Sequence, residues 1–103
     1  IERQQQMLRN QRASFDKELK ALLVQEEARI KQYRESILLE EEVLKLQEEI
    51  SALQALQLEN GTITATDYVT ELNKESIARI NLAMHQVNLM KSIASYLTIQ
   101  GNL

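Results

Sequence analysis

The 103-residue chain contains no proline, no cysteine and no tryptophan, and it has only two glycines. Proline and glycine are the residues that most often interrupt helices, so their scarcity predicts long, continuous helices. Without cysteine the chain can form neither disulfides nor thiolate metal sites, an absence compatible with the cytosol and with an oxidising compartment alike. Aromatic residues make up only 4% of the chain, which excludes a large aromatic core. The composition therefore predicts one small helical module.

Charge and hydropathy exclude two classes of partner. The formal net charge is -3 and the acidic and basic residues are interspersed, so no positive stripe is available for nucleic acid or for an anionic membrane surface. No apolar run approaches the ~20 residues that a membrane-spanning helix requires. The chain begins at Ile1 rather than at a methionine, and we interpret it as a fragment of a longer protein.

The first half of the chain has the composition of one long helix, from residue 1 to about residue 58. It is rich in Glu, Gln, Leu, Lys, Arg and Ala and contains no helix breaker. Its apolar residues recur at steps of three and four, but in two registers. The first register is Phe15, Leu19, Leu22, Ile30, Tyr33, Ile37 and Leu44, and the second is Leu39, Val43, Leu46, Ile50 and Leu53. Such a shift is typical of a coiled-coil stutter, or of a helix that contacts different neighbours along its length.

A second helix is predicted from Ala65 to about residue 100, and it carries two apolar rows. The first row is Val69, Leu72, Ser76, Ile80, Ala83, Val87, Met90, Ala94 and Leu97, and the second is Ala78, Leu82, Leu89, Ile93 and Tyr96. Together the rows are wider than the face that one partner helix can cover. At least two neighbouring helices are therefore expected.

The stretch between the two helices contains local signals for a helix end and a helix start. Asn60 and Gly61 follow the last apolar residue of the first helix, and glycine reaches the positive φ of a left-handed helix ending without a Cβ clash. Thr64 is followed three residues later by Asp67, which is the spacing of a capping box. The sequence therefore predicts a turn at residues 59–64.

These elements define the expected fold class, which is all-α: a long antiparallel α-hairpin or coiled coil with unequal arms, formed by residues 1–103 as a single unit. At 1.5 Å per residue the first helix is roughly 85 Å long and the second roughly 50 Å, so about 20 residues at the N-terminal end have no partner within the chain. Two helices cannot bury all the apolar rows against each other. We therefore expect the hairpin to assemble with further copies, or with missing parts of its own polypeptide.

The sequence shows no catalytic or metal-binding arrangement. His85 is the single histidine and has no carboxylate three residues before it, so we interpret it as an ordinary residue of a helix face or interface. The acidic runs at residues 26–27, 40–42 and 48–49 point in different directions around a helix and are interpreted as solvated faces. The serines and threonines near the turn lack a neighbouring base, and there is no glycine-rich phosphate loop. We expect no enzyme activity and no cofactor.

The segment ENGTITATDYVTELNKESIARINLAMHQVNLMKSIASYLTIQGNL, residues 59–103, resembles the end of the second repeat of TolC-family outer-membrane efflux proteins. The family pattern is a small tip loop with glycine, then Thr or Ser, an Asp and an aliphatic residue, and a helix that closes at a tyrosine and a Leu/Ile-x-Gly ending. The matching residues are Gly61, Thr62, Thr64, Asp67, Val69, Tyr96 and Gly101. Residues 1–58 match only in length and polarity, so the specific part of the resemblance covers under half of the chain.

The resemblance implies a fold and a function. In this family of Gram-negative bacteria, three protomers form a channel in which a membrane β-barrel continues into an α-barrel that crosses the periplasm. This chain would be one hairpin of that α-barrel: a periplasmic segment of a protein of the cell outer membrane, reaching the membrane only through missing β-barrel segments. It would be a passive conduit of a tripartite efflux or type I secretion system. The intact protein would be a homo-trimer. Its partners would be a periplasmic adaptor (membrane fusion protein) and an inner-membrane pump that supplies the energy.

The resemblance also implies a docking role for the tip loop. The loop would meet the hairpin tips of the adaptor, and its residues are Asn60, Gly61, Thr62, Ile63 and Thr64. Uncharged threonines can form hydrogen bonds across such a joint without the desolvation cost of ions.

A gate at the tunnel entrance is the other implied role. Asp67 matches a position at which the family places acidic side chains around the entrance, and three such carboxylates would favour cations. Ile63 stands where relatives can carry a basic residue, and Thr70 stands where a second acid can occur. A gate formed by apolar packing around Ile63 and Tyr68, which occupy the positions of a hydrophobic staple, is an equal alternative.

Two alternative functions remain open at this point. One is a structural coiled-coil scaffold whose hairpin holds a complex together. The other is the helical hairpin of the adaptor itself, which should carry an arginine-leucine docking pattern near its tip; that pattern is not found here. A full reading frame with a signal peptide and paired amphipathic strands would favour the channel.

Overall fold

The computed structural model describes residues 1–103 and contains two α-helices and no strands. Helix α1 spans Glu2–Glu59, and helix α2 spans Ala65–Gly101. Neither helix contains a proline, and all peptide bonds are trans. The all-α antiparallel hairpin predicted from the sequence is therefore confirmed.

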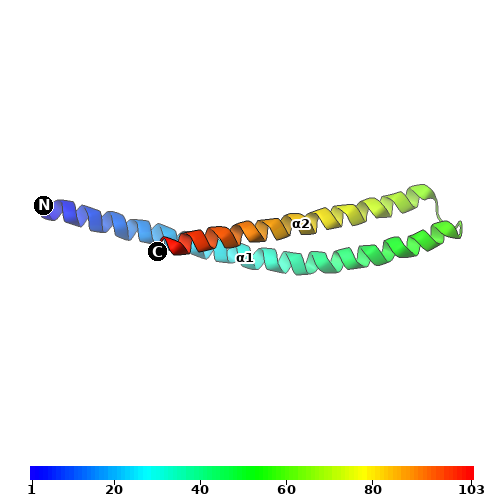
Figure 1. Cartoon of the computed structure of the whole chain (residues 1–103), viewed down its shortest axis with the longest axis horizontal. Helices are drawn as coiled ribbons and strands as arrows, with labels where there is room; N and C mark the ends of the chain where they lie inside the picture. The colour runs from blue at the N-terminus through cyan, green and yellow to red at the C-terminus, as the bar shows by residue number, and fades with distance from the viewer. The chain divides into compact units, whose positions relative to one another are not determined.

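The contacts group the chain into two compact units. Unit 1 consists of Ile1–Gln32 and Leu89–Leu103, and unit 2 consists of Tyr33–Asn88. Unit 2 contains the turn and the helical segments on either side of it. Figure 1 shows these two segments, cyan to green in α1 and yellow to orange in α2, running side by side in opposite directions.

In unit 2 the least exposed side chains recur at alternating steps of three and four residues on both helices. On α1 they are Tyr33, Ile37, Glu40, Leu44, Gln47, Ser51, Gln54 and Leu58. On α2 they are Tyr68, Glu71, Glu75, Ala78, Leu82 and His85. We call this surface the inter-helix seam. The spacing is that of a coiled coil, but about half of the seam residues are polar, so apolar burial alone does not hold these segments together.

The seam shows which of the predicted rows lies between the helices of unit 2. On α1 the first register faces the seam through Tyr33, Ile37 and Leu44, whereas the second register is exposed throughout. On α2 the second row supplies Ala78 and Leu82. The first row, which has the cleaner heptad spacing, lies outside the seam, with Val69, Ile80 and Val87 exposed by 51%, 58% and 49%. Each helix therefore has one row at the seam and one row without a partner in the chain.

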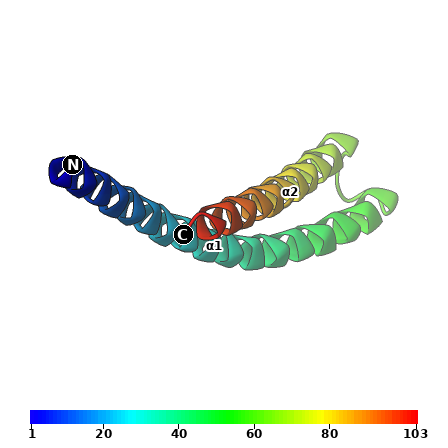
Figure 2. The same cartoon turned by 60° about the vertical axis from the view of Figure 1, so that its left-hand side comes forward.

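Unit 1 has little apolar burial. Leu19 is its buried apolar residue, and Ser92 of α2 is buried as well. Figure 2 shows the C-terminal part of α2, in red, beside α1, and the N-terminal part of α1, in blue, continuing beyond it. All of residues 1–15 are exposed. Phe15 and Leu22, which the first register places in line with Leu19, are exposed by 55% and 44%.

Candidate functional site: the turn and the inter-helix seam

The end of α1 is a Schellman motif centred on Gly61. The Thr62 amide donates to the Gln57 carbonyl (2.9 Å), and the Gly61 amide donates to the Leu58 carbonyl (3.0 Å). Gly61 has a φ of 74°, and no other residue of the chain has a positive φ. The Thr62 hydroxyl also donates to the Gln57 carbonyl at 2.9 Å. The left-handed helix ending predicted at Gly61 is confirmed, and it satisfies the last carbonyls of α1.

The start of α2 is a capping box formed by Thr64 and Asp67. The Thr64 amide donates to Asp67 Oδ2, and the Asp67 amide donates to Thr64 Oγ1, both at 3.1 Å. The first helical bond follows, from the Tyr68 amide to the Thr64 carbonyl (3.2 Å). The predicted cap is confirmed. It also means that the Asp67 carboxylate holds the helix start, whatever else it does in the intact protein.

The tip loop itself is exposed and uncharged. Asn60, Gly61, Thr62 and Thr64 are exposed, and Ile63 is half-buried. The flanking charges are Glu59 and Asp67, outside the loop. Hydrogen bonds on the two sides of the loop hold the hydroxyls of Thr62 and Thr64 in place. The loop therefore has the properties of a small polar contact surface on a rigid support.

A hydrogen bond between Gln47 and Glu71 crosses the seam on the turn side of unit 2. Gln47 Nε2 donates to Glu71 Oε2 (2.8 Å) and lies 3.3 Å from the Glu71 carbonyl oxygen. Lys74 Nζ donates to the other carboxylate oxygen of Glu71 (3.1 Å). These two bonds, that of Gln47 first, lower the pKa of Glu71 from its ordinary value of 4.5 because they favour its charged form.

The second polar contact of the seam joins His85 to Glu40. The imidazole Nδ1 and the carboxylate lie 2.7 Å apart, and the Tyr33 ring is tilted by 42° against the imidazole at a centroid distance of 6.1 Å. A carboxylate only accepts hydrogen bonds, so Nδ1–H is the donor. A third pair, Arg79 with Glu48 at 3.3 Å, is more exposed on both sides and contributes little to stability.

Two expectations about charged residues change with these contacts. The acidic run at residues 40–42 was interpreted as a solvated face, and this is wrong for Glu40, which is half-buried against His85. The same correction applies to Glu26, which is buried and accepts from Arg29 (2.8 Å). Glu40 lies three residues after Ile37 and four before Leu44 of the inter-helix seam, so the helix turns it toward α2. Glu26 lies three residues before Arg29, so the two side chains are neighbours on the helix surface and can form an ion pair.

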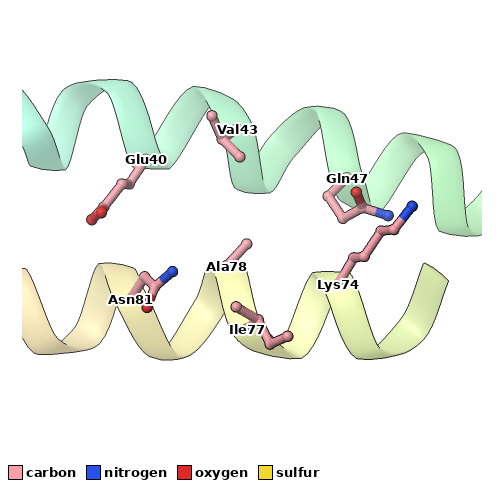
Figure 3. Close-up of a pocket in the computed structure, with 7 residues that line it drawn as sticks. All are labelled: Glu40, Val43, Gln47, Lys74, Ile77, Ala78 and Asn81. Carbon is pink, nitrogen blue, oxygen red and sulfur yellow. The ribbon is translucent and has the colours of Figure 1, made fainter. Parts of the chain in front are cut away.

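A groove opens along the seam in unit 2. Figure 3 shows Glu40 and Asn81 at one end, Gln47 and Lys74 at the other, and Val43, Ala78 and Ile77 between them. The small side chain of Ala78 leaves space between the longer ones. Val43 and Ile77 are exposed by 54% and 58%. The middle of the groove is therefore apolar and the ends are polar, as in a hole that receives one apolar side chain of a neighbouring helix.

Polar contacts are also found in unit 1, between residues 69 positions apart. The Tyr96 hydroxyl donates to Glu27 at 3.2 Å. This bond, which exists only while the phenol is protonated, raises the pKa of Tyr96 from its ordinary value of 10.0. Glu27 belongs to one of the acidic runs, so this run too has a partner on α2.

The chain has no group of three or more His, Cys, Asp or Glu side chains arranged to hold a metal ion. Neither α1 nor α2 is apolar enough over a sufficient length to cross a membrane as a helix.

No protein-family model, curated protein or solved structure matches this chain.

Proposed function

We propose that this chain is a periplasmic helical-barrel segment of a TolC-like outer membrane channel. In this proposal the intact protein is a homo-trimer, and the hairpin is part of the wall of a passive conduit for efflux or type I secretion. The tip loop at residues 60–64 docks to a periplasmic adaptor, and an inner-membrane pump supplies the energy. The hairpin is neither an enzyme nor the holder of a cofactor.

The exposed apolar rows on both helices carry the proposal. In unit 2 the second register of α1 is exposed by 43 to 64%, and it consists of Leu39, Val43, Leu46, Ile50 and Leu53. Full burial of one such side chain is worth about 1.5 to 3 kcal/mol, so covering the part still exposed releases roughly 1 kcal/mol per residue, or about 5 kcal/mol for the row. The first row of α2 is exposed as well, apart from the half-buried Leu72. Helices in the wall of a barrel have neighbours on both sides, and this arrangement supplies a row for each.

The tip loop supports the second part of the proposal. It is exposed, uncharged and held between a Schellman motif and a capping box. Threonine hydroxyls and an asparagine amide can bond a partner without the cost of removing ions from water.

The absence of cysteine allows a direct test of docking. In the intact polypeptide, Thr62→Cys places one thiol at the exposed tip, and Glu49→Cys places one on an exposed part of α1. Cells that produce either variant are treated with a short thiol-to-amine cross-linker, and the adducts are identified by mass spectrometry. We expect the tip variant to cross-link to an adaptor of the membrane fusion class and the Glu49 variant not to do so.

Cell fractionation in the same experiment separates the channel from the alternatives. Recovery of the intact polypeptide in the outer membrane, with an adaptor adduct at position 62, supports the channel. Recovery away from the outer membrane, with adducts only between copies of the chain, would support a structural coiled-coil scaffold, which the exposed rows also permit. Equal adaptor adducts at both positions would contradict docking through the tip.

The exposed rows lead to a second test, on the 103-residue chain itself. We expect it to self-associate in sedimentation experiments at micromolar concentration, because association covers the apolar rows. Leu46→Gln should weaken this association, whereas Glu42→Gln, an exposed change on the same helix, should leave it intact. A stable, folded monomer would contradict the assignment of these rows to helix contacts.

A further inference from the structure

The pair of Glu40 and His85 is the seam contact that joins a carboxylate to an imidazole. Its two residues are 45 positions apart in the sequence, one on each helix of unit 2. His85 is the single histidine of the chain. Imidazole is the side chain that ordinarily changes charge between pH 5 and pH 8, whereas the carboxylates are already ionised there.

Two ionisable side chains of α1 lie against His85. The ionisable groups that face it from α1 are Glu40, at 2.7 Å, and Tyr33, whose ring centroid lies 6.1 Å away. On α2 itself, residues 80–88 contain no ionisable side chain besides His85. A carboxylate at this distance attracts an imidazolium.

The pair of His85 and Glu40 is less exposed than the other ion pair that joins the two helices. The side chains of His85 and Glu40 are 35% and 24% exposed, whereas those of Arg79 and Glu48 are 59% and 48% exposed. The bond is short, and it becomes charge-assisted when the imidazole is protonated. A neutral imidazole must also keep its proton on Nδ1 to retain the bond, which restricts it to one of two tautomers.

We propose that Glu40 and His85 form a proton-dependent clasp across the hairpin, which holds α1 and α2 of unit 2 together more firmly at mildly acidic pH than at alkaline pH. The clasp requires one carboxylate on α1 and one imidazole on α2. It is independent of any adaptor, membrane or further copy of the chain, so it stands apart from the proposed function.

Thermal unfolding followed by circular dichroism tests the clasp in four chains at the same concentration: the parent chain, Glu40→Gln, His85→Gln and Glu41→Gln. The last is a matched control, because Glu41 is exposed and makes no ion pair or hydrogen bond. From about pH 8 to about pH 5.5 we expect the midpoint of the parent chain to rise by about 2 to 4 °C relative to His85→Gln. Glu41→Gln should keep this rise and Glu40→Gln should lose it.

An equal pH response in the parent chain and in Glu40→Gln would overturn the clasp, as would a parent response no larger than that of His85→Gln. A second measurement uses the folded parent chain alone and does not require any variant to fold. The single histidine gives one set of imidazole signals in NMR, and at about pH 5.5 we expect its Nδ1 proton to be protected from exchange with water. A rapidly exchanging Nδ1 proton in the folded chain would also overturn the proposal.

Discussion

Replacing Gly61 with alanine tests the physical basis of the turn. A Cβ added at this position meets no atom within 4 Å, so the substitution introduces no steric clash with the rest of the chain. The cost comes from the backbone alone, because a φ of 74° brings a Cβ too close to its own carbonyl oxygen. That conformation costs an L-residue about 1 to 2 kcal/mol. Replacing glycine with alanine also reduces the conformational entropy of the unfolded chain, which stabilises a protein where alanine fits the native φ. At Gly61 the native φ does not suit alanine, so this entropic gain does not offset the backbone strain.

We therefore expect Gly61→Ala to lower the free energy of unfolding by about 1 kcal/mol, which corresponds to roughly 4 to 8 °C in the melting midpoint of a chain of this size. Asparagine tolerates the left-handed region better than alanine does, so Gly61→Asn should lie between the parent chain and the alanine variant. Circular dichroism at one chain concentration is the appropriate assay, because association would add to the apparent stability.

The second glycine supplies the control. Gly101 ends α2, its φ is not positive, and a Cβ there also meets no atom within 4 Å. Alanine is the better helix former, so Gly101→Ala should leave stability unchanged or raise it by up to about 1 kcal/mol. If the two alanine variants had the same stability, the left-handed helix ending would not be the source of the effect and the account of the turn would be refuted.

Three further changes test contacts elsewhere in the chain. Thr64→Ala should lower the free energy of unfolding by about 1 kcal/mol. The double variant with Asp67→Ala should lose less than the sum of the two single losses, because both residues form one capping box. Additive losses in urea unfolding would contradict this. Ser51 is buried and its hydroxyl has no hydrogen-bond partner, so Ser51→Ala should stabilise the fold by about 1 kcal/mol. The exposed Ser76→Ala should stabilise it by only about 0.5 kcal/mol, through the higher helix propensity of alanine. Equal effects would contradict a cost of burying the Ser51 hydroxyl. The raised pKa of Tyr96 means that its bond stabilises the fold below pH 10.0 and is lost at higher pH, so Tyr96→Phe should show a smaller alkaline loss of stability than the parent chain in a pH series of melts.

The elements that the sequence predicts correctly are those determined by neighbouring residues. The left-handed ending at Gly61 depends on the absence of a side chain, and the start of α2 depends on Thr64 and Asp67, three residues apart. The helices themselves follow from composition and from the lack of breakers. None of these features requires knowledge of what lies across the hairpin.

The features that the sequence does not predict depend on the rotation of each helix about its axis. The sequence shows two apolar rows on α2 but does not tell which one faces α1, and the row with the cleaner spacing turns out to be exposed. The contact of Glu40 with His85 is missed for the same reason. One signal was present: the two residues lie at similar distances on either side of Gly61, as paired residues of a hairpin do.

The separation of polar and apolar residues in unit 2 has a consequence for assembly. Hydrogen bonds such as that between Gln47 and Glu71 contribute little energy each, but they form only when donor and acceptor are opposite one another, so they determine the register of the hairpin. The outer rows, such as Leu39 to Leu53, offer more energy per side chain but accept any apolar surface of suitable shape. The contacts that set the register of the hairpin and the apolar rows that can bind neighbouring helices thus lie on different faces of the same helix. A hairpin built in this way keeps its own alignment when neighbouring helices cover it, because the contacts that align it are not the contacts that bind the neighbours.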